Sequence, residues 1–248
     1  MNRYKASSAH LGISIVIAGI VYIAVRYLWY PGALFDVAGG LQLLVLIIVV
    51  DVILGPLITL IVFKPGKPGL KFDLAFIGVV QLTALAYGLW SIAESRPVFL
   101  TFVKDRFELV RAGELEEADL AEAAPGFGNL PWFGYRLAGA RLPRDPKEQL
   151  KYMDLGVVGG KDLHYFPKLY VDYSAVAGEA ARASGPLAEL RKLNPGREGE
   201  VEAVVRRAGP EEALGFLPMR AGKSDLTVIV KKPTGEVEAL LALRPWEY

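Results

Sequence analysis

Three long apolar runs occupy the first hundred residues of the chain. They cover Leu11–Tyr30, Leu41–Phe63 and Leu74–Ala93. Each run is close to the ~20 residues that an α-helix needs to cross a hydrocarbon core. After Arg96 and Pro97 the pattern becomes mixed, with charged residues spread among short apolar stretches. The hydropathy pattern therefore predicts a membrane protein with three transmembrane α-helices, followed by an extramembrane part.

The extramembrane part alternates between β-prone and helical patterns. We expect strands at Val98–Val103, Phe107–Val110, Tyr135–Leu142, Leu226–Val230 and Val237–Leu243. We expect helices at Glu114–Ala124, Pro146–Leu155, Asp172–Ala183, Pro186–Leu193 and Arg197–Arg207. The first two strands and the last two strands each read as a hairpin. The chain thus divides into a three-helix transmembrane domain at residues 1–96 and an α+β domain at residues 97–248, which is long enough to bury its own core.

Basic residues mark one side of the predicted membrane. The N-terminal segment and the second loop contain Arg3, Lys5, Lys64, Lys67 and Lys71, whereas the first loop at residues 31–40 contains no lysine or arginine. Short loops rich in lysine and arginine face the cytoplasm, so the N-terminus is predicted to be cytoplasmic and the α+β domain to be exported. Trp29 and Trp90 fall at the predicted outer ends of their helices, where interfacial aromatic side chains are enriched. In a bacterium this is a multi-pass inner-membrane protein with a periplasmic domain.

Several polar residues lie inside the predicted spans. Asp51 is about ten residues into the second run, roughly 15 Å deep, where a carboxylate costs at least ~2.5–3.5 kcal/mol. Gln81 and Thr83 lie at a comparable depth in the antiparallel third helix and are candidate hydrogen-bond partners. Two interpretations stay open. The set is either a clamp between helices, worth about 1 kcal/mol or less, or a site for a partner helix or a transported proton.

Gly55 and Pro56 follow one turn after the aspartate. Proline removes a backbone donor and kinks a helix, and Thr59 is placed to satisfy the carbonyl that this frees. The kink is either a packing feature or a groove into which another helix docks. Asp73 lies in the first turn of the third helix, where the helix dipole and the loop lysines explain it. Arg26 is near the outer interface and is expected to anchor the helix there.

Composition excludes several classes of function. The chain has no cysteine and a net charge of +1, so thiol chemistry and nucleic-acid binding are not expected. No nucleotide-binding or hydrolase motif is present. The two histidines, His10 and His164, fall on opposite sides of the predicted membrane, so we expect no histidine-based metal site. We predict no catalytic residue, metal or cofactor, and the weak cluster Asp162, His164 and Tyr165 is the nearest approach to an active site.

An ordered string of motifs runs through residues 1–110. Its members are Trp29-Tyr30-Pro31-Gly32, the segment 51–63 (DVILGPLITLIVF), Lys64-Pro65-Gly66-Lys67, Leu70-Lys71-Phe72-Asp73-Leu74, Gln81-Leu82, Tyr87-Gly88, Arg96-Pro97 and Asp105-Arg106-Phe107. In these motifs the chain resembles the TfpX/TfpZ family of type IV pilin accessory proteins. The remainder matches that family in length and general character.

This resemblance implies an inner-membrane accessory or chaperone-like protein that binds the type IV major pilin and supports pilus assembly. Other inner-membrane pilus assembly proteins and the lipid bilayer are the further partners that it implies. Pilins have an apolar N-terminal helix with an acidic residue near its start, and such a helix needs a groove and a polar partner. The second helix, with Gln81, Thr83 and Arg26 nearby, is a candidate for both. The alternatives are a membrane-anchored periplasmic enzyme that modifies pilin or its glycan, and a small transporter.

Overall fold

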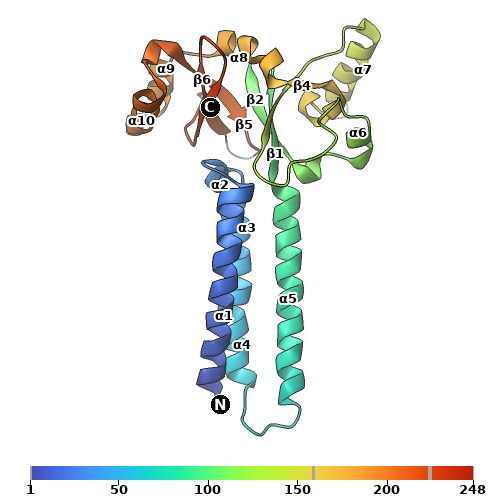
Figure 1. The fold of residues 1–248 in the computed structure, drawn as a ribbon, viewed down its shortest axis with the longest axis vertical. Coiled ribbons are helices and arrows are strands. Elements are labelled where there is room, and N and C mark those ends of the chain that lie inside the picture. The colour runs from blue at the N-terminus through green and yellow to red at the C-terminus, as the bar shows by residue number, and fades with distance from the viewer. Residues whose placement is uncertain (1, 158–159, 223–224, 248) are drawn as a thin grey trace.

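A computed structural model of the chain describes residues 2–157, 160–222 and 225–247. A bundle of long helices supports a mixed sheet flanked by short helices (Figure 1). Three helices are long and apolar enough to cross a membrane, and they cover Arg3–Trp29, Gly40–Val62 and Leu70–Ser95. The predicted fold class, three apolar helices followed by an α+β domain, is confirmed.

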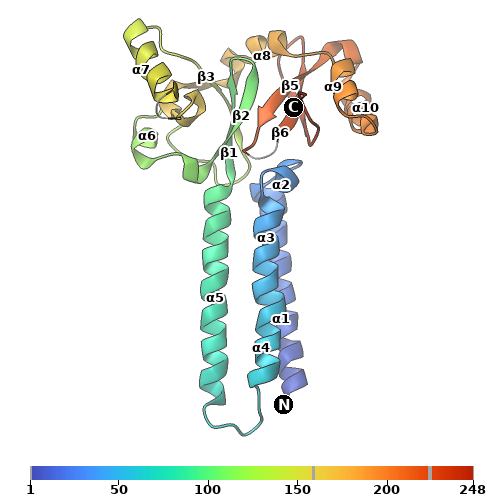
Figure 2. The ribbon, with the colours of Figure 1, turned by 180° about the vertical axis from the view of Figure 1, so that it is seen from behind.

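The first two spans each contain a π-helical turn. The elements in chain order are α1 (Arg3–Ile23), a π-turn (Ala24–Trp29), α2 (Leu34–Val37), α3 (Gly40–Ile48), a second π-turn (Val49–Leu54), α4 (Gly55–Val62) and α5 (Leu70–Ser95). The second π-turn ends directly before Gly55 and Pro56. A wider turn at this point accommodates a proline that has no backbone N–H to donate. Figure 2 shows α3 and α4 in front of α1, with α5 beside them.

The tight loop between α4 and α5 makes these helices antiparallel neighbours. Gly66 and Gly69 adopt positive φ angles of 76° and 80°, a conformation that glycine takes without a steric penalty. Lys67 and Asp73 form the expected ion pair, with 2.5 Å between Nζ and Oδ2. The loop lies at the same end of the bundle as the N-terminus, away from the sheet (Figure 1).

The domain is built on one seven-stranded sheet with the order β4-β3-β1-β2-β5-β6-β7. Its strands are β1 (Pro97–Val103), β2 (Arg106–Arg111), β3 (Arg136–Ala140), β4 (Tyr170–Asp172), β5 (Leu214–Arg220), β6 (Asp225–Lys231) and β7 (Val237–Leu241). The pairs β1–β2 and β6–β7 are antiparallel, so both predicted hairpins are confirmed. The pairs β1–β3 and β2–β5 are parallel.

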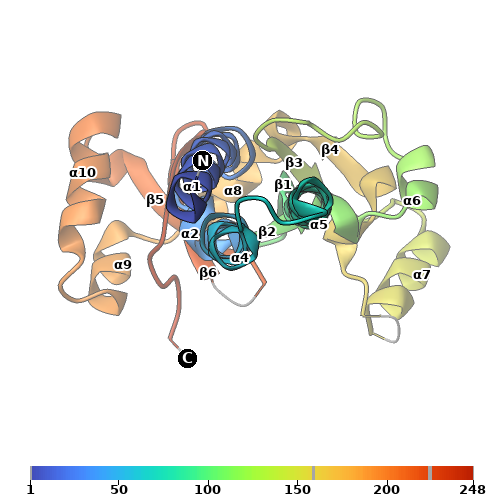
Figure 3. The ribbon, with the colours of Figure 1, turned by 90° about the horizontal axis from the view of Figure 1, so that it is seen from below.

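In the described part of the chain, five α-helices lie around the sheet, and some differ from the predicted ones. They are α6 (Glu117–Ala121), α7 (Pro146–Val157), α8 (Ala177–Ala183), α9 (Leu187–Leu193) and α10 (Glu198–Ala208). The helix predicted from Asp172 begins only at Ala177, because Asp172 pairs with Ala138 in β4. The helix predicted from Glu114 begins at Glu117, after a 3₁₀ turn. Viewed from below, α6 and α7 lie to one side of the bundle, and α9 and α10 to the other (Figure 3).

One hydrophobic cluster runs from the bundle into the sheet. It contains Val25, Tyr30 and Ile92 from the helical part together with Leu100 and Phe107 from the strands. The Tyr30 hydroxyl donates to the backbone oxygen of Ile92 at 3.4 Å. The division of the chain at residue 96 stays a prediction, because this shared core crosses it.

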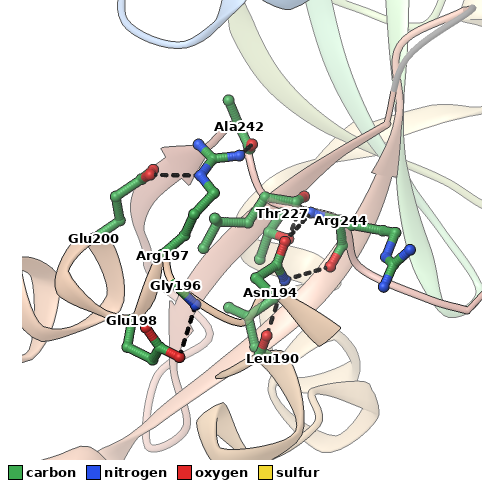
Figure 4. Close-up of polar contacts among 10 residues, drawn as sticks. Leu190, Asn194, Gly196, Arg197, Glu198, Glu200, Thr227, Ala242 and Arg244 are labelled. Carbon is green, nitrogen blue, oxygen red and sulfur yellow. Dashed lines mark hydrogen bonds and ion pairs between the residues drawn. The ribbon is translucent and has the colours of Figure 1, made fainter. Parts of the chain in front are cut away.

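A buried asparagine fixes the segment that follows β7 (Figure 4). The Asn194 amide donates to the backbone oxygens of Leu190 and Arg244, each at 2.9 Å, and accepts from the Arg244 backbone N–H at 2.8 Å. Arg197 bonds Glu200 and the backbone oxygen of Ala242. The turn between α9 and α10 is therefore bonded to the segment that follows β7.

Candidate functional site

An incomplete polar cluster lies in the middle of the helical bundle. Asp51, in the second π-turn, is only 7% exposed. Gln81 of α5 donates from Nε2 to the backbone oxygen of Asp51 at 3.4 Å. Within the described residues, Oδ2 of Asp51 and Oε1 of Gln81 are buried and have no hydrogen-bond partner. The predicted pairing of these two residues is thus present through the backbone, and it leaves polar atoms of both side chains unsatisfied.

Gly55 makes room for the glutamine. A Cβ at Gly55 would lie 1.9 Å from Nε2 of Gln81, so a larger residue here would force the amide away from Asp51. The sequence singled out Gly55 together with Pro56 as a helix kink. In the structure, the absence of a side chain at Gly55 allows α5 to approach the second span closely.

Polar contacts from α1 complete this part of the bundle. Ser7 donates from Oγ to the backbone oxygen of Pro56 at 2.9 Å, and Nδ1 of His10 lies 2.7 Å from Oγ1 of Thr59. Thr59 therefore contacts a histidine, and among the described residues it does not form the expected bond to a freed carbonyl. Sequence reasoning missed His10 and Ser14, although their regular spacing with Ser7 along an apolar helix indicated one polar face.

The other predicted membrane residues lie outside the cluster. The Arg26 guanidinium carbon is 5.4 Å from the ring centroids of both Tyr27 and Phe35, which places it beside α2 at the sheet end of the bundle. The Thr83 hydroxyl donates to the backbone oxygen of Val79 in its own helix and is exposed. Neither residue reaches Asp51.

The interfacial residues divide between the two ends of the bundle (Figure 1). Trp29 and Trp90 lie toward the sheet. The lysines Lys64, Lys67 and Lys71 lie at the opposite end, in or beside the loop between α4 and α5. This distribution agrees with the sequence pattern from which the orientation was predicted.

Pockets flank α5 where it meets the other helices. A pocket of 150 Å³ between α1 and α5 is lined by His10, Ser14, Asp51 and Gln81 among apolar side chains. A second, of 180 Å³, lies between α3 and α5 and is also lined by Asp51. A third pocket of 380 Å³ between α4 and α5 is mainly apolar. Asp51 therefore lines pockets on two sides of α5.

A second cluster lies in the sheet domain and was only partly predicted. Ligand atoms of Glu108, Asp162 and His164 all lie within 4.8 Å of one another. They line a pocket of 630 Å³, together with residues that include Arg111, Tyr165 and Arg220. The predicted trio of Asp162, His164 and Tyr165 is thus found in one pocket, with Glu108 added to it.

Burial shifts the titration of this second cluster. Glu108 is 5% exposed, and burial raises the pKa of its carboxyl from 4.5 to about 7, opposed by the Arg220 and Arg106 charges. Burial also lowers the pKa of His164. Sequence reasoning missed Glu108 because it is far from Asp162 in the chain. The signal was a lone carboxylate between Phe107 and Leu109 of an apolar strand.

Comparison with known proteins identifies relatives that share most of the chain. The fimbrial assembly protein of serogroup I from Dichelobacter nodosus is 31% identical over 226 residues, which is 89% of this chain and 87% of that protein. The serogroup E1 protein of the same species has the same identity and coverage. The protein of serogroups C1 and C2 is 32% identical over 122 residues, 48% of this chain and 92% of its own length.

No protein-family model matches the chain. No solved structure matches it either. The relatives nevertheless cover both the helical bundle and the sheet domain at more than 30% identity. The chain therefore belongs to the family of fimbrial assembly proteins.

Proposed function

We infer that this protein supports the assembly of type IV pili by holding the pilin subunit in the bacterial inner membrane before it is polymerised. The N-terminus and the lysine-rich loop then face the cytoplasm, and the sheet domain faces the periplasm. In this role the protein is an accessory or chaperone of the TfpX/TfpZ type, and its partners are the major pilin and other inner-membrane assembly proteins.

The observation that carries this proposal is the unsatisfied polar cluster around Asp51. Hydrocarbon cannot hydrogen-bond to Oδ2 of Asp51 or Oε1 of Gln81. An apolar helix with one donor group, such as a protonated carboxyl group or another polar side chain, would cover the pocket between α1 and α5 and supply the absent hydrogen-bond donor. His10 and Ser14 line the same pocket, and His10 is the side chain suited to meet a carboxyl group. Pilin has such a helix, according to the resemblance noted above.

In-cell photocrosslinking tests this site directly. A photoreactive amino acid at Ile13, which lines the pocket and is 61% exposed, is expected to capture pilin. Ile15 is the matched control, since it is 53% exposed on the same helix but does not line the pocket. Equal capture from both positions, or capture from neither, would show that pilin does not dock here.

Deletion of the gene tests the wider role. Loss of surface pili with normal total pilin places the protein in assembly, whereas loss of both places it in protection of the subunit. Normal surface pili would contradict the proposal. A reporter fused after residue 248 that is active only in the cytoplasm would overturn the proposed orientation.

A second function is favoured by the pocket at Glu108, Asp162 and His164. Buried titratable groups in one pocket are typical of active sites, so an enzyme that modifies pilin or its glycan is the alternative. Alanine substitution of Asp162 and His164 distinguishes the two. Unchanged pilin mass and normal piliation in these variants would exclude the enzyme.

A further inference from the structure

We propose that Glu108, Asp162 and His164 form a binding site for a first-row divalent transition-metal ion, of which Zn²⁺ is the test case. The site lies in the sheet domain, away from the bundle pocket described above, and it does not depend on pilin binding.

Two separate elements bring the three donors together. Glu108 lies on β2, opposite Thr101 of β1 and Arg220 of β5. Asp162 caps a 3₁₀ turn, Leu163–Tyr165, by accepting from the Leu163 backbone N–H at 2.7 Å through Oδ1. His164 is within that turn. The cap fixes the turn, so the imidazole and both carboxyl groups converge without a rearrangement of the backbone.

The histidine supplies the independent observation that points to a ligand. His164 is 7% exposed, and within the described residues its Nδ1 is buried with no hydrogen-bond partner. A buried polar atom without a partner costs ~1–3 kcal/mol. Coordination of a metal ion through Nδ1 would remove this deficit, because a neutral imidazole offers the lone pair of its unprotonated nitrogen to the metal.

Neighbouring basic groups do not account for the cluster. Arg106 lies 3.6 Å from Glu108, measured from Nε to Oε1, and Arg220 also lowers the pKa of that carboxyl. Arg111 is bonded to Glu114 and to the backbone oxygen of Ala221. These arginines offset part of the negative charge, yet none of them bonds the unpartnered His164 nitrogen.

The geometry and the donor types fit a transition metal. Ligands at ~2.0–2.2 Å from a tetrahedral zinc ion lie ~3.3–3.6 Å apart, and here the ligand atoms lie within 4.8 Å of one another. Side-chain movements of up to about an ångström would close the site. An imidazole favours zinc and its neighbours, whereas calcium and magnesium prefer oxygen ligands alone. Three protein ligands leave one position open toward the pocket.

Zinc binding to the purified protein tests the proposal. The full chain is prepared in detergent with a tag that contains no histidine, stripped with a chelator and titrated calorimetrically with ZnCl₂. We expect one zinc ion per chain, retained after dialysis, and much weaker binding of CaCl₂. Absence of both heat and retained zinc would overturn the proposal.

The chain provides its own matched controls, since it contains two histidines and no cysteine. The His164→Ala and Glu108→Gln variants are expected to bind zinc at least ~10-fold more weakly. His10→Ala, in the bundle, and Glu189→Gln, on an exposed face of α9, are expected to bind it as the wild-type protein does. Equal binding by His164→Ala and His10→Ala would also overturn the proposal.

A third ligand variant guards against misfolding. Asp162 is exposed, and asparagine keeps the cap of the 3₁₀ turn, so Asp162→Asn is expected to fold normally. It should nevertheless lose zinc affinity and lose the rise in Tm that zinc gives the wild-type protein. A normally folded Asp162→Asn protein with unchanged zinc affinity and Tm shift would contradict the assignment.

Discussion

The helical bundle and the sheet domain are held together by different means. In the bundle, a few polar contacts between helices, such as Ser7 with Pro56 and His10 with Thr59, act among side chains that are largely exposed to the membrane. In the domain, fully buried aromatic residues such as Phe102 and Phe107 pack in a dense core. Substitutions on the exposed faces of the bundle should therefore affect partner binding, whereas substitutions in the core of the domain should affect folding.

The largest expected effect on stability comes from removing an aromatic ring from the core of the sheet domain. Phe107 is fully buried, with its ring centroid 5.5 Å from that of Phe102 and 5.7 Å from that of Tyr173. We expect Phe107→Ala to lower the free energy of unfolding by ~3–5 kcal/mol. Phe76→Ala, at a position of α5 that is 62% exposed, should change it by less than ~1 kcal/mol. Denaturant unfolding in detergent measures both changes. Equal losses of unfolding free energy in the two variants would contradict the difference between the bundle and the domain.

The next effect is a pH dependence confined to the domain. Because the pKa of Glu108 is raised from 4.5 to about 7 on folding, the folded protein holds a proton that the unfolded chain releases between these values. Stability should therefore fall as pH rises through this window, by up to roughly 3 kcal/mol in chelator-treated protein.

The Glu108→Gln variant isolates this contribution. His164, whose pKa is lowered, gives a slope of the opposite sign at acidic pH. The informative quantity is therefore the difference in Tm between the wild-type protein and the Glu108→Gln variant at each pH. A difference that does not change with pH would show that Glu108 titrates normally.

A smaller effect concerns the polar cluster in the bundle. Asp51→Asn preserves the side-chain size and the backbone bond to Gln81, so the protein should remain folded. We expect it to lower pilin capture from Ile13 by about fivefold to tenfold, which corresponds to ~1–1.4 kcal/mol. The control is Asp73→Asn, because Asp73 is an acidic residue that does not line this pocket. Equal capture by the two variants would remove Asp51 from the binding site.

The smallest effect is expected at the lysine-rich loop between α4 and α5. Lys67 and Asp73 form a half-exposed ion pair, and such pairs contribute ~0–1 kcal/mol. Lys67→Ala should therefore leave Tm nearly unchanged. Membrane orientation, measured with a reporter after residue 248, should also be retained, because Lys64 and Lys71 keep the loop basic.

The sequence predicted the long elements well because their signals are local. Apolar runs of about twenty residues and a polar turn between two β-prone runs can be recognised without knowledge of tertiary structure. The turn of the first hairpin lies at Lys104, whose φ is 60° in the structure. β5 was missed because Gly215 and Pro218 disguise it as a loop. The proline is tolerated there because β5 pairs with β2 only through Met219 and Arg220.

The sites were less predictable because they depend on contacts between distant segments. The closeness of Asp51 and Gln81 followed from helix depth and antiparallel geometry. Helix depth does not reveal which way a side chain points, so Thr83 was wrongly expected beside them. Glu108 meets His164 only because a 3₁₀ turn packs beside β2, and no periodicity in the sequence encodes that encounter.

Only Arg96 separates the last turn of α5 from the first strand of the sheet. The π-turn at the end of the first span is bonded to the loop before β3, since the Gly134 backbone N–H donates to the backbone oxygen of Leu28 at 2.6 Å. The sheet domain is consequently joined to the bundle without a flexible linker. A tilt of α5 would move the sheet with it, so under the proposed function the binding of a helix inside the membrane would be transmitted to the sheet domain.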